Sequence, residues 1–117
     1  MFRVIIAGGR NFTDKEKLFA TMDKLLSRTR DDITVVCGKA RGADTLGEEY
    51  AKVRGYAIAY YPADWDRHGR AAGFVRNIEM AQNADALVAF WDGQSRGTKH
   101  MIETAKQHGL EVRVIQY

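Results

Sequence analysis

The chain has 117 residues, of which 45% are hydrophobic and 28% are charged, so it is expected to be one globular domain spanning 1–117 rather than a disordered segment. Its single cysteine, Cys37, cannot form an internal disulfide, which favours a reducing, cytoplasmic location, and no apolar run approaches the about 18 residues of a membrane span. The net charge of +3 is too small to indicate nucleic-acid binding by itself.

Apolar residues follow two alternating periodicities along the chain, which predict a regular succession of strands and helices. Short runs rich in β-branched residues predict strands at 2–7, 33–37, 57–61, 86–91 and 112–115. Apolar residues at helical spacing predict one helix after Thr13, one from about Ala43 to Arg54, and others at 70–82 and 98–108. The segment 63–69, which follows the only proline, is expected to be a loop.

Local sequence patterns predict where two of the helices begin or end and which side chains a third one buries. Thr13 and Glu16 have the spacing of a capping box, so Thr13 is expected to cap the first helix. Gly55 follows the second helix at the position where a left-handed residue commonly ends it. The helix at 70–82 is expected to bury three apolar side chains, Phe74, Ile78 and Ala81.

The strict alternation of strands and helices predicts an α/β fold with a parallel sheet and helices on both faces. The first, second and fourth strands are almost continuously apolar, as in strands covered on both sides. The strand at 112–115 begins with polar and apolar residues in alternation, which fits a sheet edge. We therefore predict a single Rossmann-like, doubly wound sheet of five strands in the order 3-2-1-4-5.

Ligands of such sheets bind beyond the carboxyl ends of the strands, where the strand order reverses. Three glycine-containing loops lie at this edge, at 8–11, 38–44 and 92–98, and each leads into a helix. Glycine lets a backbone approach a ligand closely, and helix amino termini offer free N–H groups to an anion. Seven basic residues lie in or beside these loops: Arg10, Lys39, Arg41, Arg67, Arg70, Arg96 and Lys99. The edge is therefore suited to a compact phosphorylated ligand.

Two widespread phosphate motifs are absent. The first strand is not followed by G-x-G-x-x-G, and Gly97-Thr98-Lys99 does not have the order of a P-loop. This disfavours NAD-dependent redox chemistry and P-loop hydrolysis, so no cofactor is expected. The alternation Asp64, Asp66 and His68 is a weak metal pattern, and we predict no metal site.

The segments GGR at 8–10, GKARGAD at 38–44 and DGQSRGT at 92–98 resemble motifs of the SLOG superfamily. This superfamily unites the DNA-processing protein DprA/Smf with the LOG nucleotide phosphoribohydrolases, and the small YspA/cpYpsA-related group is the most similar part of it. The resemblance covers nearly the whole chain. It implies a Rossmann-like fold with a nucleotide site.

A second likeness concerns the LOG motif R-x-x-E-M-A, which resembles RNIEMA at 76–81. It implies that Arg76 and Glu79 help to form the nucleotide site and that Gly97 and Thr98 form the phosphate turn. The chain departs from LOG proteins because Met101 stands where their catalytic glutamate is expected. The catalytic residues are therefore unknown, with Glu79 and Glu103 as the candidates.

The expected ligand-binding residues are Gly8, Gly9, Arg10, Gly38, Arg41, Gly42, Asp44, Arg76, Glu79, Trp91, Ser95, Arg96, Gly97 and Thr98. Backbone N–H groups of Gly9, Gly42 and 97–98, with the side chains of Arg10 and Arg96, are expected to hold phosphate. Sugar or base would then contact three side chains, Arg76, Asp44 and Trp91.

Structural roles are open alternatives for several of these side chains. Asp44 could instead cap the second helix, Arg76 and Glu79 could form a surface ion pair, and Trp91 could pack in the core.

The resulting hypothesis is a protein that senses or sequesters a nucleotide or a nucleotide-derived ligand, such as an ADP-ribose-type signal. One alternative is a LOG-like hydrolase or transferase at the N-glycosidic bond of nucleoside monophosphates. The other is a DprA-like DNA-binding module, which the small net charge disfavours. Tyr50, Phe74 and Met101 could leave apolar surface for a homo-oligomer.

Overall fold

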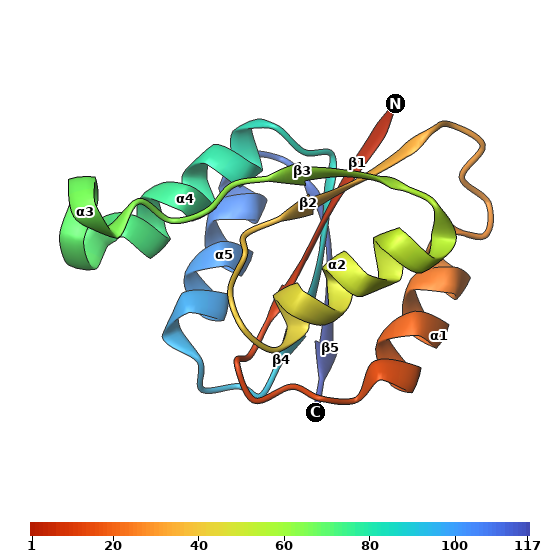
Figure 1. Ribbon diagram of the computed structural model, residues 1–117, viewed down its shortest axis with the longest axis horizontal. Helices are drawn as coiled ribbons and strands as arrows, with labels where there is room; N and C mark the ends of the chain where they lie inside the picture. The colour runs from red at the N-terminus through yellow and green to blue at the C-terminus, as the bar shows by residue number, and fades with distance from the viewer.

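The computed structural model describes residues 1–117 and contains one sheet of five parallel strands in the order β3-β2-β1-β4-β5. The strands are β1 (Phe2–Gly8), β2 (Ile33–Cys37), β3 (Ala57–Tyr60), β4 (Ala86–Trp91) and β5 (Glu111–Gln116). The predicted α/β fold and strand order are confirmed. Figure 1 shows the chain entering the sheet at the amino end of β1 and leaving at the carboxyl end of β5, on opposite sides of the molecule.

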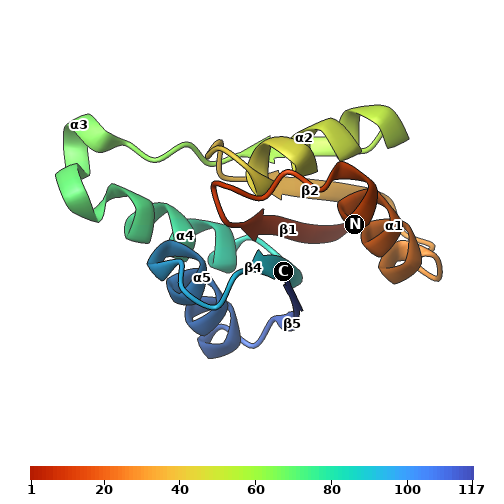
Figure 2. The same cartoon turned by 90° about the horizontal axis from the view of Figure 1, so that it is seen from below.

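Helices cover both faces of the sheet. The helices are α1 (Lys15–Leu26), α2 (Ala43–Arg54), α3 (Trp65–His68), α4 (Ala72–Gln82) and α5 (Arg96–Gln107), with a 3₁₀ turn at Gly69–Ala71. Figure 2 shows α1 and α2 on one side of the sheet and α4 and α5 on the other, while α3 stands away from the sheet. No helix combines the length and the apolar character needed to cross a bilayer.

Side chains of successive strand residues form two cores, one on each face of the sheet. Val4 and Ile6 pack with α1 and α2, whereas Ile5 and Ala7 pack with α4 and α5. This alternation arises because neighbouring residues of a strand point to opposite faces. It explains why the inner strands are almost continuously apolar, since each of their residues is covered.

Two local predictions at helix starts are corrected by the structure. Asp14, not Thr13, caps α1, because the helix begins at Lys15 and the Asp14 carboxylate accepts a hydrogen bond from the Lys17 N–H at 3.1 Å. The segment expected as a loop contains α3, which Asp64 caps in the same way through the Arg67 N–H. The expected left-handed Gly55 is confirmed, with φ of 73°.

The predicted buried face of α4 is partly wrong. Phe74 and Ile78 are 46% and 39% exposed, whereas Ala81 is buried as expected. The helix turns Ala72, Asn77 and Met80 inward instead, because it packs against α5 and, through Met80 and Ala81, against the sheet. Of the three side chains expected on an oligomer surface, only Phe74 is exposed, since Tyr50 and Met101 are fully buried in the two cores.

Candidate nucleotide site

A cavity of about 440 Å³ lies beyond the carboxyl ends of β1 and β4. The cavity wall includes residues of all three glycine-containing loops and of α4. The residues that line it are Ala7, Gly8, Gly9, Arg10, Asn11, Ala40, Asp44, Trp65, Arg70, Gly73, Phe74, Arg76, Asn77, Met80, Asp92, Ser95, Gly97, Thr98 and Met101. We call it the main cavity.

The first two loops touch through their backbones. Gly42 has a φ of 76°, and a Cβ atom there would lie 2.2 Å from the Gly9 carbonyl oxygen, so only glycine fits without displacement. The same carbonyl accepts a hydrogen bond from the Ala43 N–H at 3.2 Å, which ties the start of α2 to the end of β1. The Gly9 N–H donates to the Phe90 carbonyl at 3.0 Å. The expectation that this N–H is free for phosphate is therefore wrong, because the link between β1 and β4 uses it.

Asp44 is a buried carboxylate in the wall of the main cavity, with an exposed fraction of 5%. It does not cap α2, because the N-cap is Gly42 and the carboxylate turns back to accept the Ala40 N–H at 3.3 Å. Burial raises the pKa of Asp44 to about 6, while the nearby positive charge of Arg76 and the Ala40 N–H act in the opposite direction. The carboxylate is therefore held as an acceptor that changes charge close to neutral pH.

Arg76 reaches from α4 to the loop after β2. Its Nη1 donates to the Gly38 carbonyl oxygen, and its Nε donates to the Asn77 Oδ1 at 3.1 Å. It forms no ion pair with Glu79, which is exposed and outside the cavity wall. The proposed surface pair of Arg76 and Glu79 is therefore absent, and the guanidinium is held by neutral acceptors.

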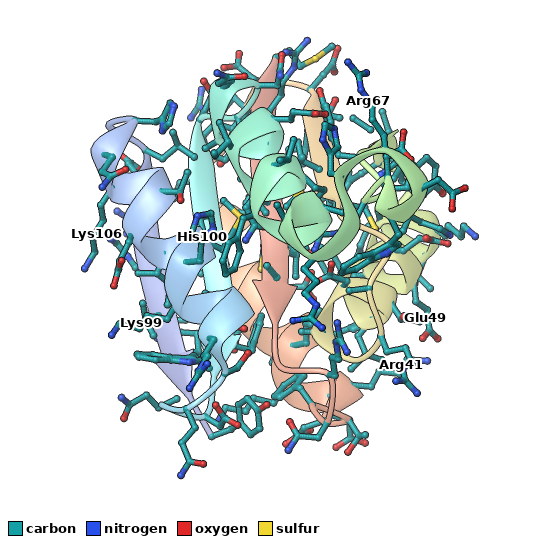
Figure 3. The ribbon with its side chains drawn as sticks, turned by 90° about the vertical axis from the view of Figure 1, so that its left-hand side faces the viewer. Arg41, Glu49, Arg67, Lys99, His100 and Lys106 are labelled. Carbon is teal, nitrogen blue, oxygen red and sulfur yellow. The ribbon has the colours of Figure 1, made fainter.

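Asn77 links α4 to α5 and was not predicted as a site residue. Its side chain is 5% exposed, and its Nδ2 lies 3.3 Å from the Gly97 carbonyl oxygen and 3.1 Å from the His100 Nδ1. In Figure 3, His100 lies between α4 and α5, whereas the labelled lysines of α5 point outward. A polar residue with low helix propensity on the same helix face as Met80 and Ala81 was the available signal.

The loop after β4 ends in a capped helix start. Ser95 caps α5, since its Oγ accepts the Thr98 N–H at 3.4 Å, and Asp92 accepts the N–H groups of Gln94 and Ser95 at 2.8 and 2.9 Å. These backbone hydrogen bonds lower the pKa of Asp92. The Gly97 N–H has no acceptor within the chain and remains available in the first turn of α5.

The Trp91 side chain makes its contacts within the protein. Its Nε1 donates to the Ser95 carbonyl oxygen at 3.1 Å, and its ring packs against the core beneath α5. Trp65 instead lines the main cavity and is 54% exposed. Of the two tryptophans, the one on α3 therefore has its surface at the site.

The structure separates the sequence-predicted site residues into three groups. Eight line the main cavity: Gly8, Gly9, Arg10, Asp44, Arg76, Ser95, Gly97 and Thr98. Two line a neighbouring hollow, Gly38 and Arg41. Four line neither: Gly42, Glu79, Trp91 and Arg96. The other catalytic candidate, Glu103, is exposed on α5 with its Oε1 3.9 Å from the Lys99 Nζ.

Three arginines in the main cavity wall form no direct ion pair, although the charges of two of them, Arg10 and Arg76, act on the nearby Asp44 carboxylate and lower its pKa. Arg10, Arg70 and Arg76 form no ion pair, although five ion pairs occur elsewhere in the chain. No three His, Cys, Asp or Glu side chains come together as a metal site would require. The arrangement is suited to an anion held by arginine and backbone N–H groups.

Comparisons with known proteins identify the relatives of this chain. Residues 2–68 match the YspA, cpYpsA-related SLOG family. The chain is 36% identical over 118 residues to the Gene 61 protein of Mycobacterium phage D29, covering 96% of this chain and 94% of that protein.

Two solved structures share the fold. DprA of Streptococcus pneumoniae has a TM-score of 0.73 at 15% identity over 97% of this chain, which spans only 49% of the DprA chain. The structural genomics target TM1055 has a TM-score of 0.69 at 20% identity, covering 96% of this chain and 72% of that one. The sequence matches and the shared Rossmann-like fold agree: the chain belongs to the YspA, cpYpsA-related SLOG family.

Proposed function

We propose that this protein binds a nucleotide or a nucleotide-derived ligand, of which ADP-ribose-type signals are one class, and thereby senses or sequesters it. The observation that carries the proposal is the convergence of three arginines without ion pairs on one cavity at the switch point of the sheet. The cavity volume of about 440 Å³ falls within the usual range of small-molecule sites.

The phosphate of the ligand would bind between the arginines and the start of α5. The Gly97 N–H has no acceptor in the chain and carries the partial positive charge of a helix amino terminus. Arg10 and Arg76 approach the same cavity from the loop after β1 and from α4. Charge-assisted hydrogen bonds from such donors are about twice as strong as neutral ones, so they would supply most of the affinity.

The base and sugar would contact the α3–α4 side of the cavity. Phe74 is half-exposed and stacks on His100, with ring centroids 4.2 Å apart, and Trp65 adds a second exposed aromatic face. Aromatic faces of this kind stack on nucleobases. The Asp44 carboxylate, which the fold holds through the Ala40 N–H, would accept a hydrogen bond from a ribose hydroxyl.

Binding without N-glycosidic cleavage fits the carboxylates of the site better than the LOG-like alternative. Met101 is buried in the cavity wall at the position where LOG proteins have a catalytic glutamate. Glu79 and Glu103 lie outside the wall, and backbone N–H groups already bind Asp44 and Asp92. Neither candidate catalytic glutamate is therefore placed to stabilise an oxocarbenium-like charge, and Asp44 is the carboxylate left to contact the ribose.

A thermal-unfolding panel of nucleoside monophosphates tests the proposal. A ligand at about 100 times its Kd should stabilise the protein by about 2.7 kcal/mol, which raises Tm by about 10 °C for a chain of this size. Arg76→Gln should reduce the shift to about half or less. Arg67→Gln should leave it intact, because Arg67 is an exposed arginine on α3 that lines neither hollow. If no nucleotide shifts Tm, the proposal is wrong. If instead single-stranded DNA binds with a strong salt dependence, the DprA-like alternative replaces it.

A further inference from the structure

A second hollow of about 310 Å³ adjoins the main cavity on the side of β2 and β3. The residues that line it are Arg10, Gly38, Lys39, Ala40, Arg41, Pro62, Ala63, Trp65 and Arg76. Arg10, Ala40, Trp65 and Arg76 line both spaces, so these four residues form a shared wall. A ligand bound at this wall can contact both hollows.

The two spaces differ in charge. The main cavity has two carboxylates in its wall, Asp44 and Asp92, whereas the second hollow has four cationic side chains and no carboxylate. The only one of its cations with an ion pair is Lys39, whose Nζ lies 2.9 Å from the Glu48 Oε1. Arg41 is exposed and forms no ion pair, so its charge is available to a ligand.

The loop that carries Arg41 is fixed in shape. Lys39 has a φ of 61°, a left-handed conformation that a lysine rarely adopts. Its side chain is held by Glu48 and lies over the Tyr60 ring, with 5.1 Å between the Nζ and the ring centroid. The carbonyl of Gly38, on the other side, accepts a hydrogen bond from Arg76. The turn that carries Arg41 is therefore anchored on both sides.

We propose that the second hollow binds a second phosphoryl group of the same ligand, so that the protein prefers nucleotides with two linked phosphates to nucleoside monophosphates. This inference rests on the proposed function. Two phosphoryl groups of a diphosphate share one bridging oxygen, so both can contact Arg10 and Arg76 at the shared wall. The outer group then meets Arg41, where no protein carboxylate competes. Terminal diphosphates and bridging pyrophosphates share this chemistry.

Calorimetric titration of the full chain with a monophosphate and a diphosphate of the same nucleoside tests the inference. We expect the diphosphate to bind about tenfold more tightly or better, because one further charge-assisted contact is made. Arg41→Gln should raise the Kd of the diphosphate about tenfold and remove the preference, and Arg41→Lys should retain part of it. The matched control Arg67→Gln should keep the full preference, and Figure 3 shows the two labelled arginines well apart.

A third titration, with a nucleoside diphosphate that carries a sugar on its outer phosphate, distinguishes the sources. If this compound binds more tightly than the plain diphosphate, the preferred ligand contains a bridging pyrophosphate. If it binds more weakly, the preferred ligand ends in a terminal diphosphate. Both results support two phosphoryl subsites if Arg41→Gln removes the tighter binding of the diphosphate relative to the monophosphate. Equal affinity of monophosphate and diphosphate for the wild type would overturn the inference and leave the proposed function standing. Failure of every nucleotide to bind would overturn both.

Discussion

Arg54 and Arg76 lie on opposite faces of the sheet and show how position decides the role of an arginine. Arg54, at the end of α2, donates to the Asp23 carboxylate from Nε and Nη2 at 3.0 and 2.7 Å. Arg76, on α4, donates only to neutral oxygens and forms no ion pair. The first arginine completes a structural network, whereas the second keeps a charge that a ligand can neutralise. We call the surroundings of Arg54 the α1–α2 face and those of Arg76 the cavity face.

The largest expected effect concerns Tyr50 on the α1–α2 face. Its ring is fully buried, and its hydroxyl donates to the Asp23 Oδ1 at 2.8 Å. Tyr50→Ala should lower the free energy of unfolding by about 3–5 kcal/mol, because it leaves a large cavity in the core. Tyr50→Phe, as the control, should lower it by only about 1 kcal/mol. Urea unfolding measures both, and equal losses in the two variants would contradict the assigned role of the ring.

A pH-dependent effect is expected next, from Asp44 on the cavity face. Burial raises the pKa of Asp44 to about 6 in the folded protein, from the ordinary 3.8. Between these values the folded state binds more protons than the unfolded state, so stability falls as pH rises. Compared with Asp44→Asn, the wild type should lose about 2 kcal/mol of unfolding free energy between pH 4 and pH 7. Parallel pH profiles of the two proteins in urea unfolding would refute this.

The two arginines themselves give the third prediction. Arg76→Gln should weaken nucleotide binding by about 10- to 100-fold, since a charged hydrogen-bond donor contributes about 1.5–3 kcal/mol, and should change stability less than Tyr50→Ala does. Arg54→Gln should leave nucleotide affinity unchanged and should slightly lower the free energy of unfolding. Calorimetry measures the nucleotide affinity of both variants, and urea unfolding measures their stability. If both variants weakened binding equally, the assignment of ligand binding to the cavity face alone would be wrong.

The smallest effect is expected for Glu103, which is exposed beside Lys99. Glu103→Gln should leave both stability and nucleotide affinity unchanged within error, because an exposed ion pair of this kind contributes little. Release of free base from nucleoside monophosphates, followed by chromatography, provides the further measurement. Base release that depends on Glu103 would restore the hydrolase alternative.

The two tryptophans differ in how their surroundings arise, one from local sequence and one from the course of a distant loop. Trp91 ends a central strand and is predicted as a ligand contact, but its indole donates to Ser95 and packs, partly buried, against the core. Trp65 lies in a segment predicted as a loop and lines both hollows. The loop's course through α3 brings Trp65 back over the cavity, and no local pattern encodes that path.

The sequence alone determined the strand order, the two covered faces and the edge at which the cavity lies. These features follow from periodicity and glycine placement, which are local properties of the chain. Tertiary packing decided which groups at that edge remain free. It used the Gly9 N–H to join β1 to β4, turned Asn77 inward between α4 and α5, and left Arg76 without a direct ion pair. The availability of a donor or a charge depends on partners distant in the sequence, and only the folded chain brings them together.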